Sequence, residues 1–348
     1  MATKKKTRKL TKKQRENRRI RIATYLAFLI LIAIVVIIVV SCNHKKANKP
    51  SDSTTSAETT TVSDDIPKEY VEPTYYRDAI EITDEWATVG DSTDYSLYVN
   101  TALNATTLYK VDGDKYTPLR VMACSTGRRD GHETPEGTFY LGEWIIGPAC
   151  EWCYMADGTE GLYAYRIIDG INNDIMFHSV PFLDTDHGTI EYEEYNKLGN
   201  YASMGCIRMS IADVRYLGQL CAGGTEVYIY YDENEVLPME KPVPLFIPPT
   251  VEEVRGWDPT DPLTANPWHS YTFTMKVPNS IEVEKDSAYS EELVLNQASA
   301  TDCYGNDVSE YIACSGTVDT SAKGKYTVTV TLDLGQYHGT KNVVVVVK

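Results

Sequence analysis

One stretch of the chain, Tyr201–Met209, holds a cysteine at a sharp turn, and an upstream histidine could serve it as a base. Cys206 follows Gly205, whose missing side chain lets the backbone turn tightly and approach a substrate carbonyl. A cysteine attacks as its thiolate, and an imidazole within hydrogen-bond reach can hold it in that form and later protonate a leaving amine. The backbone N–H groups of Gly205 and Cys206 could stabilise an oxyanion there. The residue types predict Cys206 as nucleophile and His178 as base.

His178 follows an apolar run at 175–177, as expected for a residue at the tip of a buried strand. Cys206 stands at a glycine turn before a helical pattern. Each signal alone also fits a structural residue, because a lone cysteine is usually buried and a lone strand-end histidine is usually structural. Their combination favours chemistry.

The segment that must position this pair consists of short alternating runs separated by turn signals. The runs predict strands at 95–100, 107–111, 119–125, 137–141, 163–168, 175–178 and 225–230. One helix is predicted after Ser210, which can cap it, with Asp213 completing a capping-box-like pair and Gly223 ending it. The expected fold is mostly β, with one main helix directly after the cysteine loop.

The length indicates more than one folded unit, and the charge is unevenly distributed along the chain. At 348 residues the protein is too long for one ordinary core. Its net charge is −16, yet residues 1–21 hold eleven Lys or Arg residues against a single acid, Glu16. The remainder is therefore strongly acidic, which argues against nucleic acid as a partner of the folded part.

Nineteen uncharged, mostly aliphatic residues run from Ile22 to Val40, about the length that crosses a bilayer. The basic block before them predicts a cytoplasmic amino terminus and a single-pass cell-membrane protein, anchored through 22–42, with the rest outside the cell. Two alternatives stay open. The span could be a cleaved signal peptide, or Cys42 could be the acylated residue of a lipoprotein.

The composition divides the rest of the chain. Residues 43–68 read as a disordered stalk, with nine Ser or Thr among positions 51–63. Residues 69–232 are the predicted catalytic domain, and 233–269 a stiff proline-rich linker. Residues 270–348 read as a small all-β, immunoglobulin-like sandwich that serves spacing or binding. Its strands are predicted at 271–277, 280–283, 292–297, 325–332 and 342–347.

Eight cysteines in an exported chain invite pairing, although spacing alone does not give the connectivity. Cys150 and Cys153 are expected to be a loop disulfide or two thiols, since a zinc site would need a second such pair. Cys303 and Cys314 could form a local staple. Two further cysteines in apolar runs are expected to be buried thiols, Cys124 and Cys221.

The motifs around the cysteine resemble those of the L,D-transpeptidase family with a YkuD-type catalytic domain, over roughly residues 92–231. That family carries a His-Ser or His-Gly pair and then a Ser/Thr-His-Gly-Cys-x-Arg/Asn segment. Here they correspond to His178-Ser179 and Ser203-Met204-Gly205-Cys206-Ile207-Arg208. Further matches lie at 125–127, 134–139 and 224–227.

The resemblance implies a reaction. Cys206 would attack the bond after the third residue of a peptidoglycan stem tetrapeptide, releasing D-alanine and leaving a thioester. His178 would act as base and then acid, oriented by a carbonyl or a neighbouring side chain, with Ser179 the nearest candidate. The amine of a second stem peptide in the cell wall would resolve the thioester. No metal or organic cofactor is required.

Other residues of the segment receive supporting roles from the same resemblance. Backbone N–H groups of Met204, Gly205 and Cys206 would face the oxyanion. Ser203 and Arg208 would lie beside the substrate, although a salt bridge that fixes the loop is an equally good interpretation of Arg208.

One position departs from the family. Met204 stands where the family usually has histidine, and it can neither donate a side-chain hydrogen bond nor carry charge. Activity is still expected, because nucleophile and base remain. The longer separation of His178 from Cys206 suggests an inserted loop at 184–196. Its His187 is interpreted as a surface residue, with replacement of the missing imidazole as the alternative.

Two other functions fit the same residues. Water in place of the amine would make the protein an L,D-carboxypeptidase. Loss of turnover through Met204 would leave a non-catalytic wall-binding scaffold.

Overall fold

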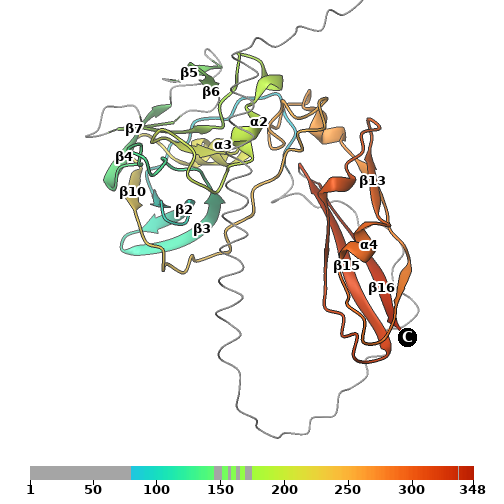
Figure 1. Cartoon of the computed structure of the whole chain (residues 1–348). Coiled ribbons are helices and arrows are strands. Elements are labelled where there is room, and N and C mark those ends of the chain that lie inside the picture. The colour runs from blue at the N-terminus through green and yellow to red at the C-terminus, as the bar shows by residue number, and fades with distance from the viewer. Residues whose placement is uncertain (1–79, 145–150, 156–157, 162–164, 169–174, 336) are drawn as a thin grey trace, which may run out of the picture. The chain divides into compact units, whose positions relative to one another are not determined.

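The computed structural model describes residues 80–348 except 145–150, 156–157, 162–164, 169–174 and 336 (Figure 1). The predicted basic segment, span and stalk lie outside the described residues. In the described part of the chain, no helix is long and apolar enough to cross a membrane. The anchor at 22–42 stays a prediction.

An eight-stranded mixed sheet organises the first folded region (Figure 1). Two pairs are parallel, β1 (Tyr95–Asn100) with β10 (Glu226–Tyr230) and β8 (Met176–Ser179) with β9 (Ile207–Met209), and the other neighbouring pairs are antiparallel. A two-stranded ribbon of β5 (Cys153–Tyr154) and β6 (Glu160–Gly161) accompanies it. The strand order in the large sheet is β3 (Lys115–Ala123), β2 (Ala105–Asp112), β1 (Tyr95–Asn100), β10 (Glu226–Tyr230), β4 (Gly137–Trp144), β7 (Tyr165–Ile168), β8 (Met176–Ser179) and β9 (Ile207–Met209).

Alternation along the strands accounts for the core. Leu97 and Val99 of β1 are fully buried, and so are Val214 and Leu217 on helix α3 (Ile211–Leu220), which belong to the same buried cluster. Complete burial of such a side chain contributes about 1.5–3 kcal/mol. The expected mostly β fold with one main helix is confirmed.

Helix α3 begins after Ser210 as predicted, and acceptors from a distant segment also bind the N–H groups of its first turn. Ser210 Oγ accepts a hydrogen bond from the Asp213 N–H at 3.2 Å. Asp258 Oδ2 accepts from the Ile211 N–H at 2.9 Å, and Thr260 Oγ1 accepts from the Ala212 N–H at 3.0 Å. Three N–H groups of the first turn, which have no partner inside a helix, are thereby satisfied. Two of the three acceptors come from the predicted linker.

The second half of the segment 233–269 is therefore not the extended connector that its prolines suggest. Ile247, Val251, Val254 and Trp268 are all fully buried. Ile247, Val251 and Val254 are spaced four and three residues apart, and the Pro248 carbonyl starts a turn by accepting from the Val251 N–H at 3.4 Å. The high number of prolines led to the prediction of a linker although the apolar spacing indicates buried turns. The domain boundaries themselves stay predictions.

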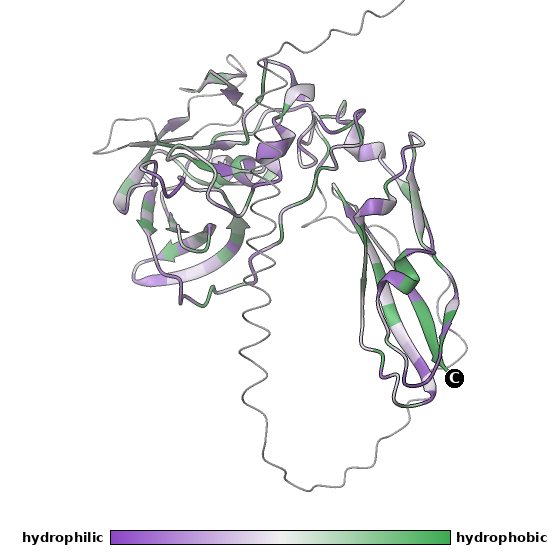
Figure 2. Ribbon diagram, viewed as in Figure 1, coloured by the Kyte–Doolittle hydropathy of each residue, from purple (hydrophilic) through white to green (hydrophobic). Residues whose placement is uncertain are grey.

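The last region contains two sheets. One pairs β11 (Phe273–Lys276) with β13 (Ser299–Asp302), and the other has the order β12 (Ser280–Val283), β16 (Tyr337–Val347), β15 (Gly324–Leu334) and β14 (Ile312–Ser315). Alternate residues of β15 and β16 are buried, and Figure 2 shows the hydrophobic end of β16 beside the carboxyl terminus. The immunoglobulin-like assignment stays a prediction.

The strand predicted at 292–297 is wrong, because Glu292–Leu295 form the short helix α4. Ser290 Oγ accepts from the Glu292 N–H at 3.2 Å and so starts a helical turn that the apolar alternation conceals. Other short helical elements are η1 (His187–Thr189), α2 (Tyr192–Tyr195), η2 (Pro267–Ser270) and η3 (Ser309–Tyr311).

The proposed staple between Cys303 and Cys314 is also wrong. Both are free thiols, with Cys303 exposed and Cys314 buried. Cys303 follows β13, whereas Cys314 lies on β14 in the other sheet, so their spacing in sequence does not bring the two side chains together. Cys150 lies outside the described residues.

Candidate active site

The parallel pairing of β8 with β9 brings the predicted nucleophile and base onto neighbouring strands. Phe177 is opposite Ile207 and His178 is opposite Arg208, while Cys206 immediately precedes β9. Neighbouring strands lie about 4.8 Å apart. Residues that are far apart in sequence thus meet at one edge of the large sheet.

One hydrogen bond determines the tautomer of the histidine. The His178 ring is 2 % exposed, and its Nδ1 lies 2.6 Å from the backbone carbonyl oxygen of Ser179. A carbonyl only accepts, so Nδ1 carries the proton and the neutral ring has its lone pair on Nε2. Ser179 Oγ instead donates to the Val180 carbonyl at 3.0 Å. Ser179 therefore orients the base through its backbone and not through its hydroxyl.

The turn before the cysteine requires glycine. Gly205 has φ +118°, and a Cβ placed there would be 2.9 Å from Ile175 Cδ1. Thr134 Oγ1 donates to the Gly205 carbonyl at 2.8 Å and accepts from the Gly127 N–H at 2.9 Å. A side chain from the 134–139 motif thereby ties the cysteine turn to the 125–127 motif.

Ser203 changes the expected set of oxyanion donors. Its Oγ accepts from the Gly205 N–H at 3.1 Å and donates to the Cys206 carbonyl at 2.5 Å. The Gly205 N–H is therefore engaged inside the turn and is not the oxyanion donor predicted from the sequence. Of the three predicted backbone donors, Met204 and Cys206 remain candidates.

The strand segment 125–127 holds the cysteine loop from its other side. Ser125 and Arg208 exchange two backbone hydrogen bonds, at 2.8 and 2.9 Å, and the Arg128 N–H donates to the Ser203 carbonyl at 3.0 Å. Asn104, which the sequence did not single out, accepts from both the N–H and the hydroxyl of Thr126, at 3.0 and 2.7 Å. Asn104 has φ +48°, a conformation that asparagine tolerates, so an asparagine just before a strand was the only signal in the sequence.

Comparison with known proteins gives the family of this region. Residues 94–229 match the family described as the YkuD L,D-transpeptidase catalytic domain. Residues 94–229 form a YkuD-type catalytic domain. A Bacillus subtilis (strain 168) protein described as "Putative L,D-transpeptidase YciB" is 33 % identical over 100 residues, which cover 28 % of this chain and 46 % of that protein. The chain thus spans about half the length of this curated relative.

Solved structures of L,D-transpeptidases are similar over 39 % of the chain. An L,D-transpeptidase from Mycobacterium smegmatis is 18 % identical with a TM-score of 0.31, covering 39 % of this chain and 58 % of that one. Another, from Mycobacterium tuberculosis H37Rv, is 19 % identical with a TM-score of 0.29, covering 39 % and 57 %.

In this YkuD-type domain Arg208 makes an ion pair inside the protein. Its Nη1 lies 2.9 Å from Glu194 Oε2 of α2, and the arginine is 7 % exposed. Glu194 comes from the segment predicted to be an inserted loop. Of the two interpretations of Arg208, the structure supports the salt bridge that fixes the loop, and substrate contact stays a prediction.

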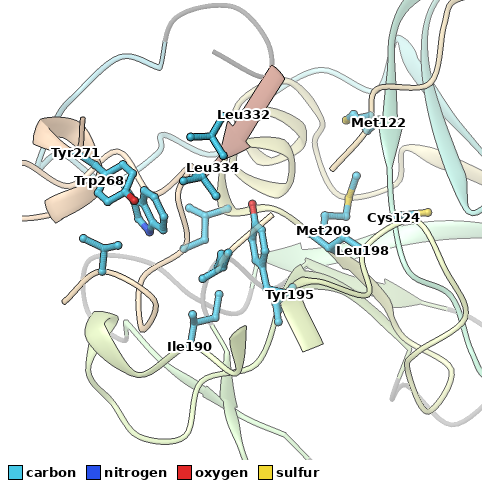
Figure 3. Packing of buried hydrophobic residues seen from close by; sticks show 14 of the residues in the cluster. Met122, Cys124, Ile190, Tyr195, Leu198, Met209, Trp268, Tyr271, Leu332 and Leu334 are labelled. Carbon is cyan, nitrogen blue, oxygen red and sulfur yellow. The ribbon is translucent and has the colours of Figure 1, made fainter. Parts of the chain in front are cut away.

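The segment 184–196 is folded rather than a simple surface loop. Tyr195 is 1 % exposed and belongs to the buried cluster, where Figure 3 shows it labelled with Leu198 and Met209. His187 was interpreted as a surface residue, yet its side chain is only 13 % exposed. Its Nδ1 lies 2.6 Å from Asp261 Oδ2 and its Nε2 lies 2.9 Å from Glu151 Oε1.

The contacts of His187 exclude it as a substitute base. Carboxylates only accept, so hydrogen bonds at both ring nitrogens require the protonated imidazolium. Burial lowers the pKa of His187, but the hydrogen bond and charge of Asp261, together with those of Glu151, more than offset this and raise the pKa overall. The ring also stacks on Trp257, with centroids 5.9 Å apart. Met204, at 53 % exposure, therefore has no imidazole from His187 in its place.

Two buried cysteines of the same domain, Cys124 and Cys221, are poor nucleophiles. Burial raises the pKa of Cys124 to about 12 and that of Cys221 to about 12, so both stay protonated near neutral pH, as expected from their apolar runs. In the part of the chain that the structure describes, no group of three or more His, Cys, Asp or Glu residues is arranged to hold a metal ion.

Proposed function

We propose that this protein is a peptidoglycan L,D-transpeptidase that works through a thioester at Cys206. The observation that carries the proposal is the tautomer of His178, fixed by the Ser179 carbonyl on β8, the strand that pairs with β9 directly after Cys206. A neutral ring with its lone pair on Nε2 is the form that a general base needs. The match of residues 94–229 to the YkuD family supports the same reaction class.

The first half-reaction follows from these groups. His178 takes the thiol proton, and the Cys206 sulfur attacks the carbonyl of the third stem residue. Backbone N–H groups of Met204 and Cys206 stabilise the oxyanion. The carbon–nitrogen bond to the terminal D-alanine then breaks, His178 returns the proton to the leaving amine, and a thioester remains.

The second half-reaction joins two stem peptides. The side-chain amine of an acceptor stem attacks the thioester carbonyl, the carbon–sulfur bond breaks, and His178 carries the proton from the amine back to sulfur. An amide cross-link and the free thiol result. Water as the acceptor would give a tripeptide, which is the L,D-carboxypeptidase reaction.

The test is incubation of the purified full-length chain in detergent with a disaccharide-tetrapeptide, followed by mass spectrometry of the products. Cross-linked dimer with free D-alanine is the expected result. Tripeptide with free D-alanine but no dimer would replace the transpeptidase by the carboxypeptidase. Unchanged substrate would leave the wall-binding scaffold as the remaining function.

We also propose that residues 22–42 anchor the protein in the cell membrane with the catalytic domain outside, where the cell wall lies. The uncharged run and the basic residues before it support this orientation. Fractionation of cells followed by protease treatment of intact protoplasts tests it, because an external domain would be digested and a cytoplasmic one would survive.

A further inference from the structure

Arg129, in the loop beside the cysteine turn, is held by two tyrosine rings. The loop 128–133 leaves the strand segment that pairs with Ser203, and the His132 carbonyl oxygen lies 3.8 Å from where a Cβ of Gly205 would be. The loop is therefore a direct neighbour of the turn that presents Cys206. It carries two arginines, Arg128 and Arg129, in a chain with a net charge of −16.

The two arginines have different surroundings. Arg128 Nε lies 3.3 Å from Asp130 Oδ2, so its charge is compensated within the loop. The Arg129 guanidinium instead lies 4.8 Å from the ring centroid of Tyr201 and 4.5 Å from that of Tyr231, and its Nη2 donates to Tyr201 Oη at 3.3 Å. Among the residues that the structure describes, no carboxylate forms an ion pair with Arg129.

Two tyrosines from different elements thus fix the Arg129 guanidinium. Tyr201 lies five residues before Cys206, and Tyr231 directly follows β10. Stacking on aromatic rings holds a planar guanidinium while its N–H groups stay available in its plane. Arg129 is solvent-exposed, so a ligand can reach it. Such a held cation is suited to bidentate binding of a carboxylate.

We propose that Arg129 is a specificity-determining residue that binds a free carboxylate of the stem peptide. The inference rests on the proposed function, which supplies a substrate with carboxylates at its terminal alanine and on its acidic residue. An extended tetrapeptide spans at most about 13–14 Å, so a cation on the loop next to the cysteine turn is within the range of one stem. The chain carries a net charge of −16, so a cation beside the cysteine loop is one of few groups there that attract a carboxylate.

The test measures binding separately from chemistry. Isothermal titration calorimetry gives the Kd of a disaccharide-tetrapeptide for the full chain carrying Cys206→Ala, which cannot turn the ligand over. Arg129→Gln is then added, with Arg128→Gln as the matched control and Arg129→Lys to restore charge without the planar fork. Circular dichroism checks that each variant is folded.

Arg129→Gln is expected to weaken binding about tenfold or more, as loss of a charge-assisted hydrogen bond does, while Arg128→Gln changes the Kd less than about threefold. A stem peptide with the relevant carboxylate amidated should bind equally to the chain that keeps Arg129 and to the chain with Arg129→Gln. The inference is overturned if Arg129→Gln leaves the Kd unchanged, if it weakens every amidated peptide as much as the native one, or if the Cys206→Ala chain does not bind the tetrapeptide. Absence of D-alanine release by the unmodified chain, with binding intact, would instead overturn the proposed function alone.

Discussion

Two buried histidines of the same domain show how partners decide the role of an imidazole. His178, on β8, donates from Nδ1 to a backbone carbonyl, so the lone pair of its neutral form lies on Nε2. His187, further along the chain, lies between Asp261 and Glu151 and is an imidazolium. The first arrangement suits proton transfer, and the second suits an ion pair that joins segments of the fold.

The difference lies in what each neighbour can accept or donate. Both side chains are largely buried, so burial does not separate them. A carbonyl accepts one hydrogen bond and adds no full charge, whereas two carboxylates favour the charged ring strongly. Mutating the two histidines in parallel should therefore affect different properties.

The largest expected effect is on turnover by His178→Asn. Loss of a general base should lower kcat by about 10²–10⁴-fold, because the thiol is no longer deprotonated in place. His187→Asn should keep kcat within about threefold per folded molecule, since its ring holds no lone pair for catalysis. D-alanine release per active chain measures both. Equal losses of kcat in the two variants would contradict the separate roles of His178 and His187.

His187→Asn should act on stability instead. Its removal leaves Asp261, whose side chain is 1 % exposed, without a charged partner. Loss of hydrogen bonds to charged groups should lower the free energy of unfolding by about 1.5–3 kcal/mol, measured by urea denaturation near pH 6. His178→Asn, which loses one bond to a carbonyl, should cost less, about 0.5–1.5 kcal/mol. The reverse order would contradict the ion-pair role.

The stabilisation by His187 should depend on pH. Because its pKa is raised in the folded chain above about 6.5, the unfolded value, its contribution is complete below about pH 6.5 and is lost as the pH rises through the folded pKa. The difference in unfolding free energy between the native chain and His187→Asn should therefore shrink from pH 6 to pH 9. A difference that grows over this range would contradict the raised pKa.

Asp258, close in sequence to Asp261, should add a second slope at lower pH. Burial raises its pKa to about 7, against about 3.9 when unfolded, so stability should decline between about pH 4 and pH 7 as the unfolded carboxyl ionises. Asp258→Asn should remove that part of the slope. Denaturation midpoints of both chains at pH 4, 5.5 and 7 test it, and parallel curves would assign the slope to other groups.

The smallest effect is expected for Met204→His, which restores the residue usual in the family. The side chain is half-exposed and the backbone N–H is unaffected, so stability should change by less than about 0.5 kcal/mol. A large gain in turnover would show that the methionine limits catalysis. Met204→Ala is the matched control.

Local sequence patterns predicted much of the scaffold. Alternation placed β1 and β12 with the residues that the structure shows, and Ser210 correctly indicated the start of α3. Cys206 and His178 were singled out as candidates because a glycine turn and a strand end leave short-range signals in the sequence. The prediction of a strand at 292–297 was wrong because a helical turn that begins at a serine can show the same alternation of apolar and polar residues as a strand.

Long-range partners could not be read from the sequence. Asp258 and Thr260 complete helix α3 from almost fifty residues away, inside a segment whose prolines indicated a connector. The role of His187 depends on Glu151 and Asp261, which no spacing rule connects to it. The Ser203 hydroxyl, which occupies the Gly205 N–H, likewise required the three-dimensional turn.

The most direct test of the account is D-alanine release from a disaccharide-tetrapeptide by the full chain and by its Cys206→Ala variant, with acid-quenched intact-mass analysis of each. The account predicts release by the unmodified chain, a thioester adduct on Cys206, and neither in the variant. D-alanine release that persists in Cys206→Ala would contradict it.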